Sequence, residues 1–253
     1  MCSGSWRSSR EHSNRRIGDT RRIRVGQVMP FSVSSKGRLT QHDVGRFPGN
    51  TLFDRLARAV CEAGCLPRKE LYESWEVARR VRRRLRGGRV VDLAAGHGLL
   101  SHVLLLLDDS SPEALLVDTA PPASAARLHG VLVEAWPRLA GRIVTECRPL
   151  ASVRLSADDL VVSSHACGAL TDIVLDRAAS VRARVAVLPC CHDLAELDGG
   201  SLSGWMDRSL AIDAMRAVRL EERGYQVWTQ AIPAAITPKN RLLIGEPLDT
   251  ANR

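Results

Sequence analysis

Alternation of strand-like and helix-like segments constrains this chain more than any other feature of its sequence. After Gly87-Gly88, short runs of Val, Leu, Ile and Ala alternate with longer segments whose apolar residues recur at helical spacing. Strands are predicted at residues 90–93, 114–117, 142–146, 160–163, 185–188, 226–231 and 241–245. Helices are predicted in most of the gaps, at residues 99–107, 123–136, 171–179 and 210–223. Strands joined by crossover helices predict a parallel sheet that is covered on both faces.

The last two predicted strands differ from the others in their connection. Only residues 233–239 separate them, which leaves no room for a crossover helix. A short link of this kind favours an antiparallel hairpin. We therefore expect an α/β fold with a Rossmann-like, seven-stranded, mostly parallel sheet that ends in an antiparallel hairpin.

The segments before residue 87 vary in composition. Residues 1–28 are rich in Ser and Arg and lack periodicity, so they predict a disordered basic tail, or a stretch that precedes a true start at Met29. Residues 29–66 are expected to form an extended lead-in and a helix from Thr51 to Gly64. The main domain is expected over 67–247, followed by a tail at 248–253.

A longer helix is predicted after Pro67, over about residues 68–86. Its polar face carries six arginines, which we interpret as a solvated face, with RNA contact as the alternative: Arg79, Arg80, Arg82, Arg83, Arg84 and Arg86. The net charge of +8 supports nucleic-acid binding only weakly, because seven of the arginines lie within residues 1–25. Only three of the 36 basic residues are lysines.

Cysteine usage indicates a reducing, cytoplasmic setting. The seven cysteines are odd in number, and no secretory hydrophobic segment precedes them. Cys61 and Cys65 read C-x3-C, but both fall on a helical pattern without a second Cys/His pair, so buried helix cysteines are expected rather than zinc ligands. The longest apolar run, 103–107, is far shorter than the roughly 20 residues of a membrane span.

The segment VVDLAAGHGLL, residues 90–100, joins the first predicted strand to the first crossover helix. Open α/β sheets bind ligands at the carboxyl ends of their strands, where Asp92, Gly96 and Gly98 fall. Glycines there allow positive φ and close approach of a ligand. The pattern D-x-A-x-G-x-G differs from the dinucleotide fingerprint G-x-G-x-x-G, whose first glycine would fall at Ala94.

An acidic residue ends the second predicted strand. Asp118 lies 26 positions after Asp92, and its carboxylate could accept hydrogen bonds from both hydroxyls of a ribose. Together the turn and Asp118 resemble the cofactor-binding motif of methyltransferases that use S-adenosyl-L-methionine. A Rossmann-like enzyme with another nucleotide is the alternative.

Two polar loops follow the fourth and fifth predicted strands. They read SHACGALTD, residues 164–172, and PCCH, residues 189–192. Because both loops leave the same edge of the sheet as Asp92, five side chains are expected to converge on one cleft: His165, Cys167, Cys190, Cys191 and His192.

The spaced motifs H-x-C-G-A-x-T-D and C-C-H resemble those of the methyltransferase-domain family that includes the eukaryotic tRNA acceptor-stem ribose 2'-O-methyltransferase. ITPKN, residues 236–240, is similar to the closing element of that family, and the resemblance covers roughly residues 67–246. It implies a class I methyltransferase fold, S-adenosyl-L-methionine as cofactor and RNA, preferably tRNA, as methyl acceptor. The chain departs from the family pattern at Ser164, where that pattern has lysine. A small-molecule methyltransferase and a non-catalytic cofactor-binding protein stay open as alternatives.

Candidate roles follow from this reading. His165 is expected to act as the base or orienting group for the acceptor, with a loop-shaping histidine as the alternative. The other candidate catalytic residues are Cys191, His192 and Lys239, and Lys239 could meet a phosphate or activate a hydroxyl. The candidate cofactor-binding residues are Asp92, Ala94, Gly96, Gly98, Asp118 and Ser164.

Two further expectations concern neighbouring residues. No metal is expected, because the Cβ vectors of adjacent cysteines diverge, although Cys167, Cys190, Cys191 and His192 resemble a tetrahedral ligand set. Asp172 is expected to cap the helix that follows the first loop.

Overall fold

The computed structural model describes residues 31–189, 191–192 and 199–249. The predicted basic tail at 1–28, Cys190 and residues 250–253 lie outside the described residues. The chain divides into two units, 1–31 and 32–253, and the elements described below belong to the second. Within the described residues, no helix combines the length and the apolar character that crossing a membrane requires.

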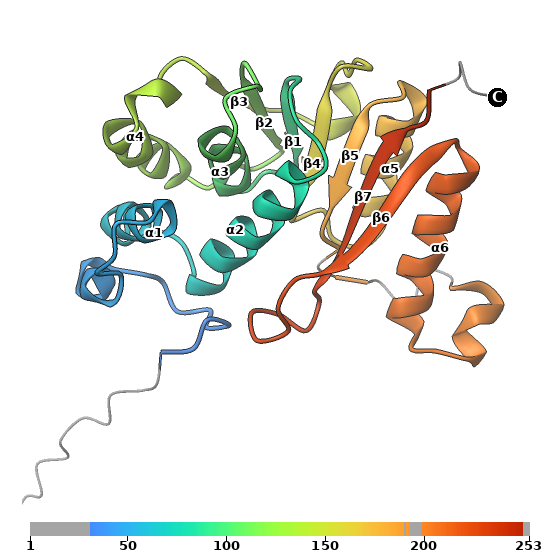
Figure 1. Ribbon diagram of the computed structural model, residues 1–253, viewed down its shortest axis with the longest axis horizontal. Coiled ribbons are helices and arrows are strands. Elements are labelled where there is room, and N and C mark those ends of the chain that lie inside the picture. The colour runs from blue at the N-terminus through green and yellow to red at the C-terminus, as the bar shows by residue number, and fades with distance from the viewer. Residues whose placement is uncertain (1–30, 190, 193–198, 250–253) are drawn as a thin grey trace, which may run out of the picture. The chain divides into compact units, whose positions relative to one another are not determined.

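Seven strands form one sheet in the order β3-β2-β1-β4-β5-β7-β6 (Figure 1). Their bounds are β1 Val90–Leu93, β2 Ala114–Asp118, β3 Ile143–Cys147, β4 Leu160–Ser163, β5 Arg184–Val187, β6 Tyr225–Ala231 and β7 Arg241–Pro247. Strands β1 to β5 pair in parallel, whereas β7 lies between β5 and β6 and runs antiparallel to both. The predicted Rossmann-like sheet with its antiparallel hairpin is confirmed.

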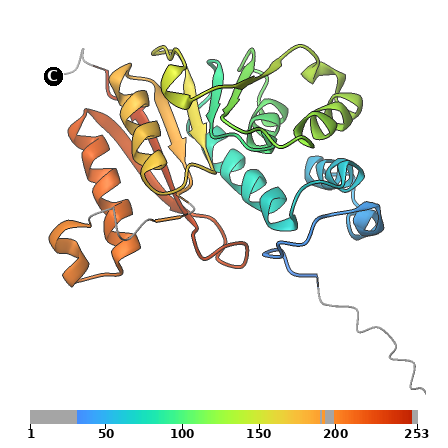
Figure 2. The same cartoon turned by 180° about the vertical axis from the view of Figure 1, so that it is seen from behind.

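The strand order explains where the helices lie. Their bounds are α1 Leu52–Ala63, α2 Arg68–Arg82, α3 Leu99–Leu107, α4 Ala125–Ala135, α5 Ala169–Ser180 and α6 Arg208–Glu222. Strands β2 and β3 follow on one side of β1, and strands β5, β7 and β6 follow on the opposite side of β4. Right-handed crossovers therefore place α3 and α4 on one face of the sheet and α5 and α6 on the other face. Figures 1 and 2 show this two-sided cover. Helix α2 packs against α3, and α1 packs against α4.

Both ends of α1 carry residues that are typical of helix ends. Thr51 caps α1, with its Oγ1 accepting a hydrogen bond from Asp54 N at 3.1 Å, and Gly64 ends the helix in the left-handed conformation, at φ 60°. Cys61 lies buried in α1 as predicted, whereas Cys65, also buried, follows the helix instead of belonging to it.

The arginine face of α2 differs from its prediction at one residue. The helix ends at Arg82 rather than near residue 86, and the Arg82 side chain is only 5% exposed. Its guanidinium donates to Leu104 O and to Ser111 Oγ, at 3.2 and 2.8 Å. Burial lowers the pKa of Arg82 to about 10. The prediction of a solvated face is therefore wrong for Arg82, which instead ties α2 to α3.

Candidate functional site

The site lies where the strand order reverses, between β1 and β4. Crossovers leave these neighbouring strands in opposite directions, and open α/β sheets bind ligands beyond the carboxyl ends of strands at such a point. The turn 94–98, between β1 and α3, and the loop after β4 both begin there. Both were predicted to meet at this edge of the sheet.

The turn after β1 is held in an unusual backbone conformation. Ala94, Gly96 and Gly98 all have positive φ, at 58°, 56° and 74°. This conformation is uncommon for a residue with a side chain, so Ala94 carries local strain. A Cβ at position 98 would lie 2.0 Å from Leu116 Cδ2, whereas one at Gly96 would only touch His165 Cδ2 at 3.5 Å. Gly98 is thus required by packing against β2, and Gly96 leaves the turn open toward the loop after β4.

Asp118, the last residue of β2, faces the turn. Its Oδ2 accepts a hydrogen bond from Gly96 N and its Oδ1 accepts one from Ala120 N, both at 2.9 Å. Each carboxylate oxygen has a second lone pair, so Asp118 can brace the turn and still accept from a ligand. The side chain is half-buried.

Asp92 lies beneath the turn and is almost fully buried, at 1% exposure. Its Oδ2 accepts a hydrogen bond from Ser101 Oγ at 2.9 Å, but its Oδ1 is buried with no partner in the described structure. Burial raises the pKa of Asp92 to about 7, with Ser101 and His165 acting in the opposite direction. A buried carboxylate oxygen without a partner favours a cationic or hydrogen-bond-donating ligand at this position.

His165 belongs to a cluster that the sequence did not predict. Its Nε2 lies 3.7 Å from Oε1 of Glu70, in the first turn of α2, and the same oxygen lies 3.7 Å from Nδ1 of His97. Burial acts to lower the pKa of His165, but Glu70, with Asp92 and Glu73, outweighs it and raises the pKa above its ordinary value. His165 is about one third exposed, at 37% of its side chain. It can therefore reach a ligand while remaining paired.

Ser164, a predicted cofactor contact, is buried at 6% exposure between the end of β4 and His165. Its neighbour Ser163 shapes the loop, because Ser163 Oγ accepts a hydrogen bond from Ala166 N at 3.2 Å. The prediction for Ser164 stays a prediction.

The remaining loop residues form a second cluster, separate from His165. Cys167, Cys191 and His192 line a pocket of about 570 Å³ that also includes Leu170 and Ile173 at the start of α5. The two loops are joined there by a hydrogen bond from Gly168 N to Cys191 O, at 3.0 Å. His165 is not among the described residues that line this pocket, and it lies beside Glu70 instead.

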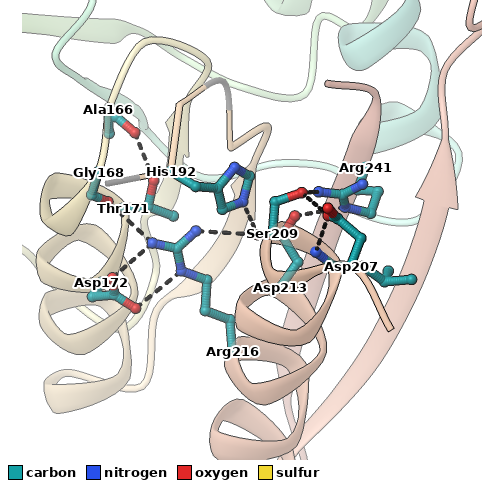
Figure 3. A network of polar contacts seen from close by, with 11 residues as sticks. Ala166, Gly168, Thr171, Asp172, His192, Asp207, Ser209, Asp213, Arg216 and Arg241 are labelled. Carbon is teal, nitrogen blue, oxygen red and sulfur yellow. Dashed lines mark hydrogen bonds and ion pairs between the residues drawn. The ribbon is translucent and has the colours of Figure 1, made fainter. Parts of the chain in front are cut away.

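His192 belongs to a polar network that joins the loop after β5 to α6 and β7 (Figure 3). Its Nε2 lies 2.8 Å from Asp213 Oδ1, and because a carboxylate only accepts, this nitrogen carries the proton. Asp213 also accepts from Arg216 and Arg241, at 3.1 and 2.7 Å. The His192 side chain is only 3% exposed, so the structure favours a supporting role over direct contact with an acceptor.

Arg216, on α6, occupies the centre of the same network. It donates to both carboxylate oxygens of Asp172, at 3.0 and 2.7 Å, and to Gly168 O at 3.0 Å (Figure 3). The predicted capping role of Asp172 is wrong, since Gly168 is the N-cap of α5 and Asp172 binds Arg216 instead.

Lys239 lies in the connection between β6 and β7, and it is exposed. Because β6 runs in the same direction as β1, this connection leaves the site edge of the sheet (Figure 1). Asn240 Nδ2 donates to Ile232 O at 2.8 Å and closes the connection into a compact loop. Lys239 therefore lies at the predicted edge.

Among the described residues, no group of three or more His, Cys, Asp or Glu side chains is arranged to hold a metal ion. Cys190, one of the four potential ligands considered from the sequence, lies outside the described residues.

The chain is similar to known proteins in its fold. No protein-family model matches the sequence, and no curated protein matches it. An O-methyltransferase family protein from Burkholderia thailandensis is similar in structure, with a TM-score of 0.49 and 19% identity over 84% of this chain and 64% of that chain. The chain thus spans less than two thirds of that protein.

Two other solved structures are similar to the same degree. They are the S-adenosylmethionine-dependent methyltransferase SibL, with a TM-score of 0.47 and 18% identity over 84% of this chain and 67% of that chain, and the B. subtilis M1A22 tRNA methyltransferase TrmK, with a TM-score of 0.45 and 16% identity over 68% and 66%. Similarity at this level assigns no function to the chain.

Proposed function

We propose that this protein is a methyltransferase that uses S-adenosyl-L-methionine. One observation carries the proposal: a turn of positive-φ residues after β1 is hydrogen-bonded to a carboxylate at the end of β2, at the reversal point of the sheet. Backbone in this conformation admits a ligand closely, and Asp118 provides acceptors for ribose hydroxyls.

The residues around the turn fit the cofactor. Its adenosine would lie against the turn 94–98 and Asp118, and its cationic methionine portion would suit Asp92, whose buried Oδ1 has no partner in the described structure. When bound, S-adenosyl-L-methionine supplies a methyl group on a positively charged sulfur. The protein then needs only to orient the acceptor and to remove its proton.

Asp118→Ala is expected to weaken cofactor binding by about 100-fold or more. The variant loses charge-assisted hydrogen bonds worth about 1.5–3 kcal/mol each and also releases Gly96 N. Titration calorimetry with S-adenosylhomocysteine measures this, and circular dichroism checks the fold. Asp176→Ala, which removes an exposed carboxylate paired with Arg223, is the control and should bind normally. Equal affinity of Asp118→Ala and the unsubstituted protein would exclude the ribose assignment.

Cofactor affinity is expected to rise with pH through about 7, the pKa to which burial raises Asp92. A cation requires the ionised carboxylate, so affinity should fall up to about tenfold per pH unit below this value. The stability of the free protein should change with pH in the opposite direction. The Asp92 carboxyl keeps its proton up to about pH 7 in the folded protein but loses it near pH 3.8 in the unfolded chain. The free energy of unfolding therefore decreases as pH rises between these two values. Asp92→Asn should remove both dependences, and a retained pH dependence in that variant would assign them to another group.

His165 is proposed as the proton acceptor. Because its Nε2 faces Glu70, Nδ1 is the ring nitrogen that would receive the proton of an acceptor hydroxyl. Cys191 would line the acceptor side of the site, and His192 would hold the loop after β5 through Asp213. Lys239 would meet a phosphate of the acceptor from the β6–β7 connection.

RNA, preferably tRNA, is proposed as the acceptor class, on the motif resemblance of the two site loops and the exposed basic side chains Lys36, Arg38 and Lys239. The test is transfer of labelled methyl from the cofactor to tRNA, other RNA, protein or metabolite fractions of a cell extract. Label in the tRNA fraction, decreasing steeply as salt increases, supports the proposal. Label in the metabolite fraction identifies a small-molecule enzyme, and cofactor binding without label in any fraction identifies a non-catalytic binding protein.

A further inference from the structure

We propose that Glu70 is a positioning residue that orients His165 and fixes which of its ring nitrogens meets the methyl acceptor. The inference rests on the proposed methyl transfer, and it assigns a role to a residue outside the sheet and its loops. Glu70 lies in the first turn of α2, upstream of every strand.

The backbone of α2 holds Glu70 firmly. The next residue, Leu71, is fully buried, and Val77, Ala78 and Val81 on the same helix are fully buried as well. The Glu70 carboxylate is itself only 13% exposed. A carboxylate whose helix is fixed in this way can orient a neighbouring imidazole.

One oxygen of Glu70 serves two histidines. Oε1 lies 3.7 Å from His165 Nε2 and 3.7 Å from His97 Nδ1. The other nitrogen of His97, Nε2, lies 3.0 Å from Ser124 Oγ, so His97 is held on both sides. His165 has its Nδ1 on the side away from Glu70. Of the two rings, His165 is therefore the one that can exchange a proton with a bound acceptor.

The pKa values of the two histidines are also shifted in opposite directions. Burial lowers the pKa of His97, with Arg38 and His165 acting in the same direction and Glu70 against it. The pKa of His165 is raised, because Glu70 outweighs the effect of burial. Of the two rings beside the shared carboxylate, His165 is therefore the more basic.

The other charged groups that face His165 do not replace Glu70. Glu73 pairs with Lys69 at 3.0 Å, which offsets its charge. Burial raises the pKa of Asp92 to about 7, so its carboxyl is partly neutral near that pH. Among the residues that the structure describes, Glu70 is the carboxylate within ion-pairing distance of the ring, and it would stabilise the imidazolium that forms when Nδ1 takes the acceptor proton.

The experiment compares Glu70→Gln with Glu70→Asp and with the control Glu76→Gln, in the full chain. Glu76 lies on the same helix and pairs with Arg79 and Arg80 instead. The first readout is the titration midpoint of the His165 ring by NMR, assigned with His165→Gln. The second is the pH profile of kcat, and the third is cofactor affinity by calorimetry.

Glu70→Gln is expected to lower the His165 midpoint and to move the acidic limb of the kcat profile to lower pH. The maximal kcat should fall about 10–100-fold, which is part of the roughly 100–10,000-fold that general acid–base catalysis contributes, while cofactor affinity changes less than about threefold. Glu70→Asp should recover part of kcat, and Glu76→Gln should match the unsubstituted protein.

An unchanged His165 midpoint in both Glu70 variants overturns the proposal, whatever happens to activity. A shifted midpoint with unchanged kcat also overturns it, because the pairing would then have no role in turnover. If the midpoint shifts but the unsubstituted protein methylates no acceptor, the pairing stands and the proposed function fails. Because Glu70→Asp keeps the charge, it remains informative if Glu70→Gln does not fold.

Discussion

Replacing Arg216 by methionine is expected to lower the free energy of unfolding by about 3–5 kcal/mol. The Arg216 side chain is 1% exposed and neutralises Asp172 and Asp213 together. Its removal would leave Asp172 without its cation and Asp213 with Arg241 and His192 as its remaining partners, which costs more than the loss of the hydrogen bonds alone. Urea unfolding of the two proteins measures this difference in the free energy of unfolding, and an unchanged m-value shows that the difference is one of stability.

Arg223→Met is the matched control for Arg216→Met. Arg223 pairs with Asp176 at the surface, where the two side chains are 46% and 61% exposed, so its loss should cost less than about 1 kcal/mol. Adding Asp172→Asn to Arg216→Met should restore part of the stability, because one stranded charge is removed. Similar costs for Arg216→Met and Arg223→Met would show that burial does not govern this network.

Gly98→Ala is expected to destabilise the protein by about 2–4 kcal/mol and to weaken cofactor binding at least tenfold. The new Cβ would lie 2.0 Å from Leu116 Cδ2, and φ at this position is +74°. The turn must therefore shift away from β2, which also moves Gly96 N from Asp118. Thermal unfolding and calorimetry with S-adenosylhomocysteine give the two values.

Gly130→Ala separates this steric effect from a general effect of alanine. Gly130 lies in α4, and a Cβ there would meet nothing within 4 Å, so the change should stabilise the helix by up to about 1 kcal/mol. In the Gly98→Ala background, Leu116→Ala should relieve the contact but not the backbone strain. If Gly98→Ala alone is as stable as the unsubstituted protein, the packing argument is wrong.

Much of the fold could be predicted from the sequence because its signals are local. Continuous apolar runs identify the central strands, and the observed bounds of β1 and β4 match the predicted ones. The place of the turn after β1 could also be predicted, since the carboxyl ends of the parallel strands β1 and β2 place Asp92, Gly98 and Asp118 at one edge of the sheet.

The pairing of Glu70 could not be predicted in the same way. Its position depends on how α2 packs against α3, and an acidic residue in the first turn of a helix is normally explained by the helix dipole. The same limit applies to Arg82 and Arg216. A buried arginine and a solvated arginine look alike in sequence. The buried one is distinguished by its carbonyl and carboxylate partners, which lie far away along the chain.

The network around Asp213 joins parts of the chain that are made at different times during synthesis on the ribosome. The turn after β1 and the carboxylate that accepts from it lie within the first 118 residues. The loops after β4 and β5 are tied to Asp213, Arg216 and Arg241, which are made later. A nascent chain that ends before residue 208 therefore contains both partners of the turn but lacks the residues that hold the two loops.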